Sequence, residues 1–220
     1  MKNAVIYVHG KGGHAEEANH YQQFFDDSFA VIGFDYKSVK PWDAKTEFAD
    51  YFSSMVSKYN KLYLIANSIG AYFSLMSLSD MPIEKAMLIS PIVDMEAIIL
   101  YMMKCENITE DELRLQKEIE TSFGESLSWQ YLSYVRRNTI YWDIPTSILC
   151  ADSDHLTSVA AMTDFAKKIH ADLTIMKDGE HWFHTNEQMK FLDHWFKENL
   201  FQSSACAAAS SRFHLRPDRG

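Results

Sequence analysis

Six short apolar runs recur along the chain and are separated by longer stretches with helical patterning. Each run is rich in aliphatic or β-branched residues, is bounded by Gly, Asp or Ser, and does not alternate with polar residues. A strand that is apolar on both faces must be covered on both, so these runs predict a mostly parallel sheet with helices on either side, the α/β class. The predicted strands cover residues 4–8, 30–34, 62–66, 85–90, 146–151 and 173–176.

Two amphipathic helices are predicted near the end of this pattern, because apolar residues recur there every three or four positions. The core-facing positions are Val159, Met162, Ala166 and Ile169 in the first helix, and Met189, Leu192 and Phe196 in the second. Thr185, followed three residues later by Gln188, forms a capping box that begins the second helix. The Gly179-Glu180-His181 cluster just before it is therefore predicted to lie in a loop.

A long insertion, from about residue 92 to 143, separates the fourth and fifth predicted strands. Met95, Ile99 and Met102 share one helical face, and Thr109 with Glu112 forms a second capping box. The insertion is too long for a simple crossover, so it is interpreted as a helical cap over the carboxyl edge of the sheet. Residues 1–200 are assigned to a single domain, whereas the Ala/Ser-rich segment 201–220 resembles a disordered or vector-derived tail.

The third predicted strand turns abruptly into a helix at Ser68, within the sequence Ala66-Asn67-Ser68-Ile69-Gly70. Such a turn lifts the serine oxygen above the sheet edge, and small residues two positions before and after it allow the backbones to approach. The start of the following helix also favours developing negative charge. Ser68 is therefore the candidate nucleophile.

This elbow resembles that of the α/β-hydrolase family, in which the usual pattern is G-x-S-x-G and Ala66 here takes the place of the first glycine. His9-Gly10-Lys11-Gly12-Gly13, directly after the first strand, is similar to the family's H-G-x-G-G segment. The resemblance implies an oxyanion hole made by the backbone N–H groups of Ile69 and Lys11, with Gly12 as the alternative to Lys11.

Two further segments match the family at strand ends. The fifth strand runs into Asp152-Ser153-Asp154, and aligning Ala151 with the glycine of the family's G-x-x-D acid loop selects Asp154, with Asp152 in reserve. A helix N-cap is the alternative role for such a carboxylate. His181 occupies the position of the family's histidine in a G-x-H loop, and the order Ser, Asp, His is the hydrolase order.

The resemblance covers residues 3–200 and implies a compact, esterase- or lipase-like serine hydrolase that lacks the family's usual two N-terminal antiparallel strands. It implies that Ser68, His181 and Asp154 cleave a carboxylic ester of a small or medium acyl or aryl group through an acyl-enzyme. A thioesterase or carbon–carbon bond hydrolase is the alternative within enzymes. A catalytically lapsed hydrolase fold that binds a small ligand is the alternative outside them.

Charge and composition limit the classes of molecule that this protein is expected to bind. A formal net charge of −9 opposes binding to nucleic acid, and the sequence contains no motif for a metal or a nucleotide, so no cofactor is expected. The apolar run after Asn3 is too short for a membrane span or a signal segment. The three cysteines form no C-x-x-C pair and fit a reducing compartment, so a cytoplasmic protein with a small-molecule ester substrate is predicted. The sequence does not predict an oligomeric state.

Overall fold

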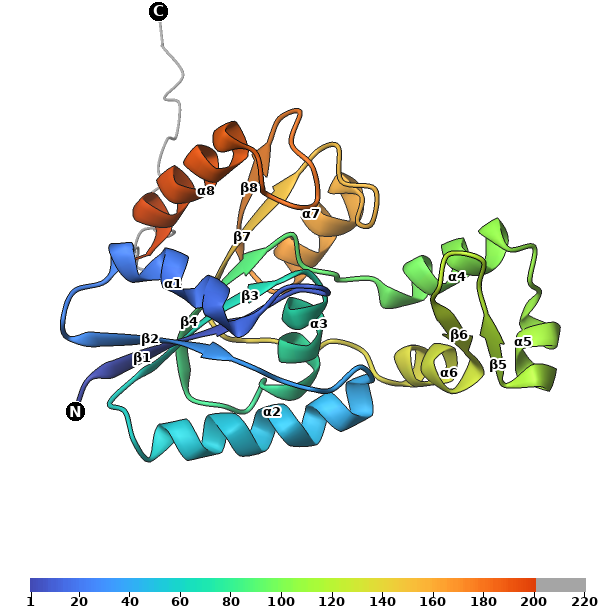
Figure 1. The fold of residues 1–220 in the computed structure, drawn as a ribbon, viewed down its shortest axis with the longest axis horizontal. Helices are drawn as coiled ribbons and strands as arrows, with labels where there is room; N and C mark the ends of the chain where they lie inside the picture. Colours follow the sequence, from blue (N-terminus) through green and yellow to red (C-terminus); the bar gives the residue numbers. More distant parts are fainter. Residues whose placement is uncertain (201–220) are drawn as a thin grey trace, which may run out of the picture.

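One six-stranded parallel sheet organises the computed structural model, which describes residues 1–200 (Figure 1). Its strands, in spatial order, are β2 (Phe29–Phe34), β1 (Asn3–Val8), β3 (Leu62–Asn67), β4 (Ile83–Ile89), β7 (Thr146–Ala151) and β8 (Asp172–Met176). All six predicted strands and the α/β class are confirmed. The predicted tail, 201–220, lies outside the described residues.

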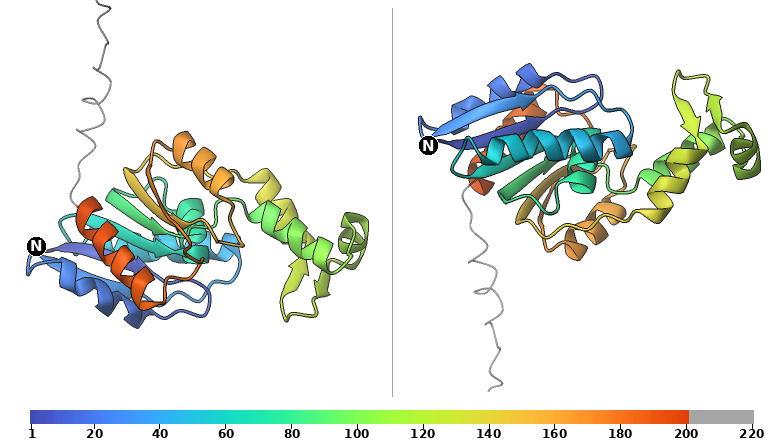
Figure 2. Two further views of the ribbon diagram at one scale, coloured as in Figure 1. Left: turned by 90° about the horizontal axis from the view of Figure 1, so that it is seen from above. Right: turned by 90° about the horizontal axis from the view of Figure 1, so that it is seen from below.

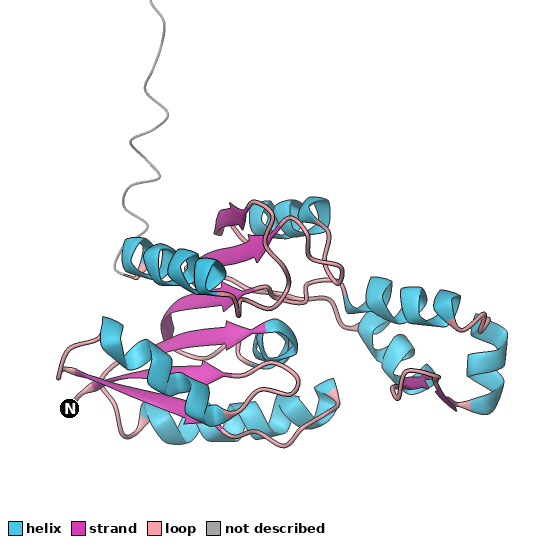
Figure 3. Ribbon diagram, turned by 45° about the horizontal axis from the view of Figure 1, so that its top comes forward, coloured by secondary structure: helices cyan, strands magenta, loops and turns pink. Residues whose placement is uncertain are grey.

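Helices cover both faces of the sheet because successive strand residues point to opposite sides. On β1, Ile6 belongs to one buried cluster and Tyr7 to the other. The first cluster packs under α2 (Pro41–Val56), α3 (Ser68–Ser77) and α7 (Val159–Lys168). The second packs under α1 (Ala18–Tyr21) and α8 (Asn186–Asn199), which lie on the other side of the strands (Figure 3). The parallel strands therefore all end at one edge, where the loops after β1, β3, β7 and β8 meet.

The insertion between β4 and β7 contains more than helices. Its elements are α4 (Met95–Cys105), α5 (Glu110–Gln116), β5 (Glu118–Glu120), β6 (Ser126–Ser128) and α6 (Trp129–Arg137). The Thr109–Glu112 capping box is present, but the antiparallel β5–β6 pair was not predicted. We call residues 92–143 the cap; it extends away from the body of the molecule (Figure 2).

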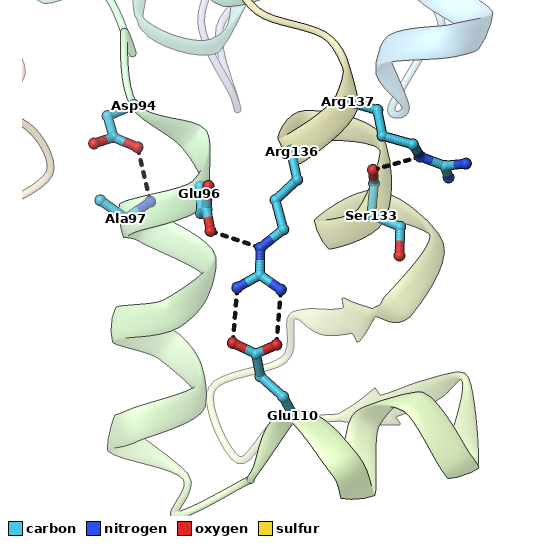
Figure 4. A network of polar contacts seen from close by, with 7 residues as sticks. All are labelled: Asp94, Glu96, Ala97, Glu110, Ser133, Arg136 and Arg137. Atoms are coloured by element: carbon cyan, nitrogen blue, oxygen red, sulfur yellow. Dashed lines mark hydrogen bonds and ion pairs between the residues drawn. The ribbon is translucent and has the colours of Figure 1, made fainter.

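Arg136 joins the three cap helices to one another (Figure 4). Its two terminal nitrogens donate to the two carboxylate oxygens of Glu110, both at 2.7 Å, and its Nε donates to Glu96 at 2.6 Å. These bonds connect α6 to α5 and α4, and a bidentate pair of this kind fixes orientation as well as distance. The cap is therefore internally braced.

Polar contacts also join the cap to the body, among them hydrogen bonds from Lys168 Nζ to the Ile140 carbonyl oxygen and from the Ile92 N–H to the Ser68 carbonyl oxygen. The Lys11 ammonium, in the loop after β1, pairs with Glu125 in the turn between β5 and β6. Trp42, at the start of α2, makes edge-on contacts with Tyr131 and Tyr134 of α6, with ring centroids 6.0 and 5.6 Å apart.

Candidate active site

Ser68 lies at a strained turn between β3 and α3. Its φ is +52°, in the left-handed region that side chains other than glycine rarely adopt, whereas Asn67 just before it is extended. A residue held in this region costs of order 1 to 3 kcal/mol, and the surrounding packing has to maintain it. The turn begins α3 at Ser68 itself, as expected for a nucleophile elbow.

Glycine at position 70 allows the elbow to pack against the loop after β1. A Cβ at Gly70 would lie 2.2 Å from the carbonyl oxygen of His9, and a Cβ at Gly10 would lie 3.1 Å from the Cβ of Ser68. Ala66, which replaces the usual first glycine, is fully buried on β3 and keeps the elbow intact. The close approach therefore depends on Gly70 more than on the position where the sequence departs from the family.

Tyr36, which sequence reasoning did not identify, contacts the loop after β1 and helps to fix its position. The Tyr36 hydroxyl donates to the carbonyl oxygen of His9 at 3.0 Å, and its ring stacks on the His9 ring with centroids 4.5 Å apart.

Within the described residues, the backbone N–H groups of Lys11 and Ile69 have no hydrogen-bond partner. Both donors predicted for an oxyanion hole are thus available, on two segments that pack together.

His181 connects the predicted nucleophile to the predicted acid. The Oγ of Ser68 lies 2.8 Å from the Nε2 of His181, and the Nδ1 of His181 lies 2.7 Å from a carboxylate oxygen of Asp154. The Asp154 side chain is 1% exposed and that of His181 is 21% exposed. The three side chains come from the ends of β3, β7 and β8 and form one hydrogen-bonded chain.

The two acids of the loop after β7 have different partners. The second carboxylate oxygen of Asp154 accepts the N–H groups of Leu156 and Thr157, at 2.7 and 3.2 Å. Asp154 is not the helix N-cap given as its alternative, because α7 begins at Val159 with Ser158 as its N-cap; its bonds to Leu156 and Thr157 lie within the loop. Asp152 instead accepts the N–H of Asp178 at 2.7 Å, which braces the loop that carries His181.

Solved structures of other proteins are similar to this one over most of the chain. Est1E from Butyrivibrio proteoclasticus aligns with a TM-score of 0.70 at 17% identity, over 90% of this chain and 86% of Est1E. Alpha/beta hydrolase domain-containing protein 10 from mouse aligns at 0.63 and 10% identity, over 90% and 89% of the two chains. An alpha-beta serine hydrolase homologue from Coxiella burnetii aligns at 0.59 and 13% identity, over 90% and 85%.

This chain has the α/β-hydrolase fold. The sequence matches no protein-family model and no curated protein. At these identities the likeness to solved structures concerns the fold alone, and the roles of individual residues rest on their geometry. The α/β-hydrolase fold places its ligand site at the carboxyl ends of the strands, which is where Ser68, Asp154 and His181 lie.

Cys150 is a second potential nucleophile near this α/β-hydrolase site. It is buried at the end of β7, where burial, together with the nearby carboxylates of Asp154 and Asp152, raises the pKa of its thiol to about 11. The thiol is therefore uncharged at neutral pH and a poor nucleophile. Ser68 therefore remains the candidate nucleophile within reach of His181.

A polar chain behind the elbow was also missed by sequence reasoning. The Tyr7 hydroxyl donates to Glu17 at 2.5 Å, and the other carboxylate oxygen of Glu17 accepts the N–H of His14 at 3.2 Å. Tyr7 also makes a side-chain hydrogen bond with Asn67, the residue before Ser68. These contacts link the loop after β1 to the elbow, and no local spacing in the sequence signals them.

Within residues 1–200, no group of three or more His, Cys, Asp or Glu side chains is arranged to hold a metal ion. None of the helices in this part of the chain has the length and apolarity needed to cross a membrane.

The two acids of this site give a matched pair of substitutions. We expect Asp154→Asn to lower kcat by about 10³- to 10⁴-fold, because an amide no longer holds the imidazole tautomer or stabilises the imidazolium. Asp152→Asn should lower kcat less than about tenfold, because an amide oxygen still accepts the Asp178 N–H. Steady-state rates on an activated ester measure both. Equal losses would contradict the assignment of Asp154 as the partner of His181.

Proposed function

We propose that this protein is a serine hydrolase that cleaves a carboxylic ester of a small or medium acyl or aryl group. The observation that carries the proposal is the chain of hydrogen bonds from Ser68 through His181 to Asp154, at 2.8 and 2.7 Å. Support also comes from the similar structures, which are described as hydrolases. Est1E has in addition been solved with ferulic acid bound, which favours aromatic acyl groups in a first panel.

In the proposed mechanism, the Nδ1–H of His181 donates to Asp154, which leaves Nε2 free to accept the Ser68 proton. The Ser68 oxygen attacks the acyl carbonyl, and the N–H groups of Lys11 and Ile69 hold the negative charge that develops on the carbonyl oxygen. The bond to the alcohol oxygen then breaks, and His181 returns its proton to the departing alcohol. Water, deprotonated by His181, attacks the acyl-enzyme to release the acid and restore Ser68.

The helix that follows Ser68 assists the same step. The N–H groups at the start of α3 point toward the elbow, and the partial positive charge of a helix N-terminus favours the oxyanion. The Ser68 turn is already in its strained conformation, so no reorganisation is needed when the substrate binds. We also propose that the protein works in the cytoplasm, a proposal supported by the free state of both cysteines within residues 1–200, Cys105 and Cys150.

Labelling with a fluorophosphonate probe tests the proposed function. We expect the folded protein to be modified at Ser68 alone, as located by peptide mapping, because only this serine has a histidine within hydrogen-bond reach of its hydroxyl among the described residues. Hydrolysis of nitrophenyl esters and of the matching acyl-CoA thioesters is then compared. A folded protein that is not labelled would support the ligand-binding alternative, and faster thioester cleavage would support a thioesterase.

A further inference from the structure

The loop that carries the Lys11 N–H has a definite local shape. Residues 10–13 form a turn that is closed by a hydrogen bond from the Gly13 N–H to the Gly10 carbonyl oxygen, at 3.1 Å. Gly12 has a φ of +73° in this turn, a left-handed conformation that glycine adopts without strain. The Lys11 N–H takes no part in the closing bond. The turn sets the shape of the loop, but other contacts must set its place above the sheet.

Tyr36 contacts the start of this loop from one face of the sheet. It is 8% exposed and belongs to the apolar cluster that packs under α2 and α3. Its hydroxyl donates to the carbonyl oxygen of His9 at 3.0 Å. A Cβ at Gly70 would meet this same carbonyl oxygen, so it is the atom at which the loop and the elbow touch. One buried hydroxyl therefore fixes the point of contact between the loop and the helix of Ser68.

Tyr7 acts on the end of the loop from the opposite face. It is 1% exposed and belongs to the second apolar cluster. Its hydroxyl donates to one carboxylate oxygen of Glu17 at 2.5 Å, and the other oxygen of Glu17 accepts the His14 N–H at 3.2 Å. Burial raises the pKa of Tyr7, so the hydroxyl stays protonated at neutral pH and donates. The carboxylate of Glu17 therefore connects a buried strand residue to the end of the loop.

Close packing keeps Glu17 in this position. It ends the 3-10 turn Ala15–Glu17, and a Cβ at Gly33 of β2 would overlap the carbonyl oxygen of Ala15. The turn therefore lies directly on the strand. A Cβ at Gly13 would lie 2.9 and 3.1 Å from the two carboxylate oxygens of Glu17. Glu17 thus packs against the loop in addition to the hydrogen bond that it accepts.

We propose that Tyr7, Glu17 and Tyr36 are positioning residues that set the Lys11 N–H at the distance from the Ile69 N–H that the oxyanion of ester cleavage requires. The proposal rests on the proposed function. An oxyanion hole works because its donors are in place before the reaction begins, and a displacement of about 1 Å can cost about 10²-fold in rate. Phenylalanine would fill the same apolar space at both tyrosine positions, so what the two hydroxyls add is their hydrogen bonds to the two ends of the loop.

The test measures nitrophenyl ester hydrolysis by Tyr7→Phe, Tyr36→Phe and the double variant. We expect each single variant to lower kcat about tenfold and the double variant about 10²-fold, with KM within about twofold of the wild type. Such a split is the mark of an interaction made only in the transition state. Ser74→Ala is the matched control, because it removes a buried hydrogen bond within α3 and leaves the loop bonds intact. Tyrosine variants that keep kcat, or lose no more than Ser74→Ala, would overturn the inference.

Two substitutions of Glu17 distinguish positioning from structural support. In Glu17→Gln the amide oxygen can accept the His14 N–H and the amide nitrogen can donate to the Tyr7 oxygen, so kcat should stay within about threefold of the wild type. Glu17→Ala loses both bonds and should lower kcat about tenfold or more. A Glu17→Ala protein that melts at a lower temperature but keeps its kcat would show that the residue has a structural role only.

Amide hydrogen exchange, followed by NMR, separates the failure of this inference from the failure of the proposed function. We expect the Gly13 and His14 amides to exchange faster in Tyr7→Phe, Tyr36→Phe and Glu17→Ala than in the wild type or Ser74→Ala. If exchange changes in this way but the wild type cleaves no ester, the loop is braced as described and the proposed function alone fails. If exchange is the same in all of these proteins, the inference fails whatever the activity.

Discussion

Ser68→Ala is expected to reduce ester hydrolysis by about 10⁴-fold or more and to abolish fluorophosphonate labelling. Without the hydroxyl no acyl-enzyme forms, and His181 can only assist water that is not held in the attacking position. The loss should fall on kcat, while KM for an ester changes little because the donors of Lys11 and Ile69 are retained. Steady-state kinetics with a nitrophenyl ester measures both constants.

Ser74→Ala provides the control for this change. Ser74 is on the same helix, is fully buried, and donates its hydroxyl to the carbonyl oxygen of Gly70 at 2.8 Å. Its substitution should lower the free energy of unfolding by about 1 kcal/mol and leave kcat within a few-fold of the wild type. Residual labelling of Ser68→Ala at another residue, with hydrolysis preserved, would show that a different nucleophile is used.

Gly70→Ala is expected to have the largest combined effect on stability and activity. A Cβ at this position would lie 2.2 Å from the His9 carbonyl oxygen and 2.9 Å from the side chain of Val8, so α3 must move away from the loop after β1. Overpacking of this kind costs about 1 to 3 kcal/mol. The displacement also separates the N–H of Ile69 from that of Lys11, so we expect kcat to fall by about 10²-fold or more.

Gly124→Ala separates this packing effect from the general cost of replacing a glycine. Gly124 lies in the β5–β6 turn with φ at +82°, and a Cβ there would meet no atom within 4 Å. The substitution should cost about 1 to 2 kcal/mol of backbone strain and leave kcat unchanged. Urea unfolding and ester kinetics on both variants measure the contrast. A Gly70→Ala enzyme with wild-type kcat would show that the two N–H groups do not act together.

Much of the fold was predictable because its signals are local. The six strands are continuous apolar runs, the helix starts at Thr109 and Thr185 have capping boxes, and the elbow at Ser68 follows from a strand that ends in small residues. The choice of Asp154 over Asp152 came from the resemblance, by aligning Ala151 with the glycine of the family's G-x-x-D acid loop. The contacts now show the physical difference, because Asp154 reaches His181 whereas Asp152 binds the N–H of Asp178.

The remaining features depend on partners that are distant in sequence. The strands β5 and β6 have three residues each, too few to show a period, and they are recognised only once paired. Tyr36 and His9 are 27 positions apart, and Lys11 and Glu125 are 114 positions apart. A contact between residues so far apart cannot be recognised from the sequence pattern around either residue.

The order of the site residues along the chain also sets when activity can begin during synthesis. Ser68 and His181 are 113 positions apart, and the whole cap is translated between them. At about 5 to 20 residues per second, the ribosome needs roughly 6 to 23 seconds to make that interval. A nascent chain therefore carries its proposed nucleophile long before its proposed base, and we expect it to remain inert until β8 joins the edge of the sheet and brings His181 into place. The onset of hydrolysis would thus report that the last strand has docked.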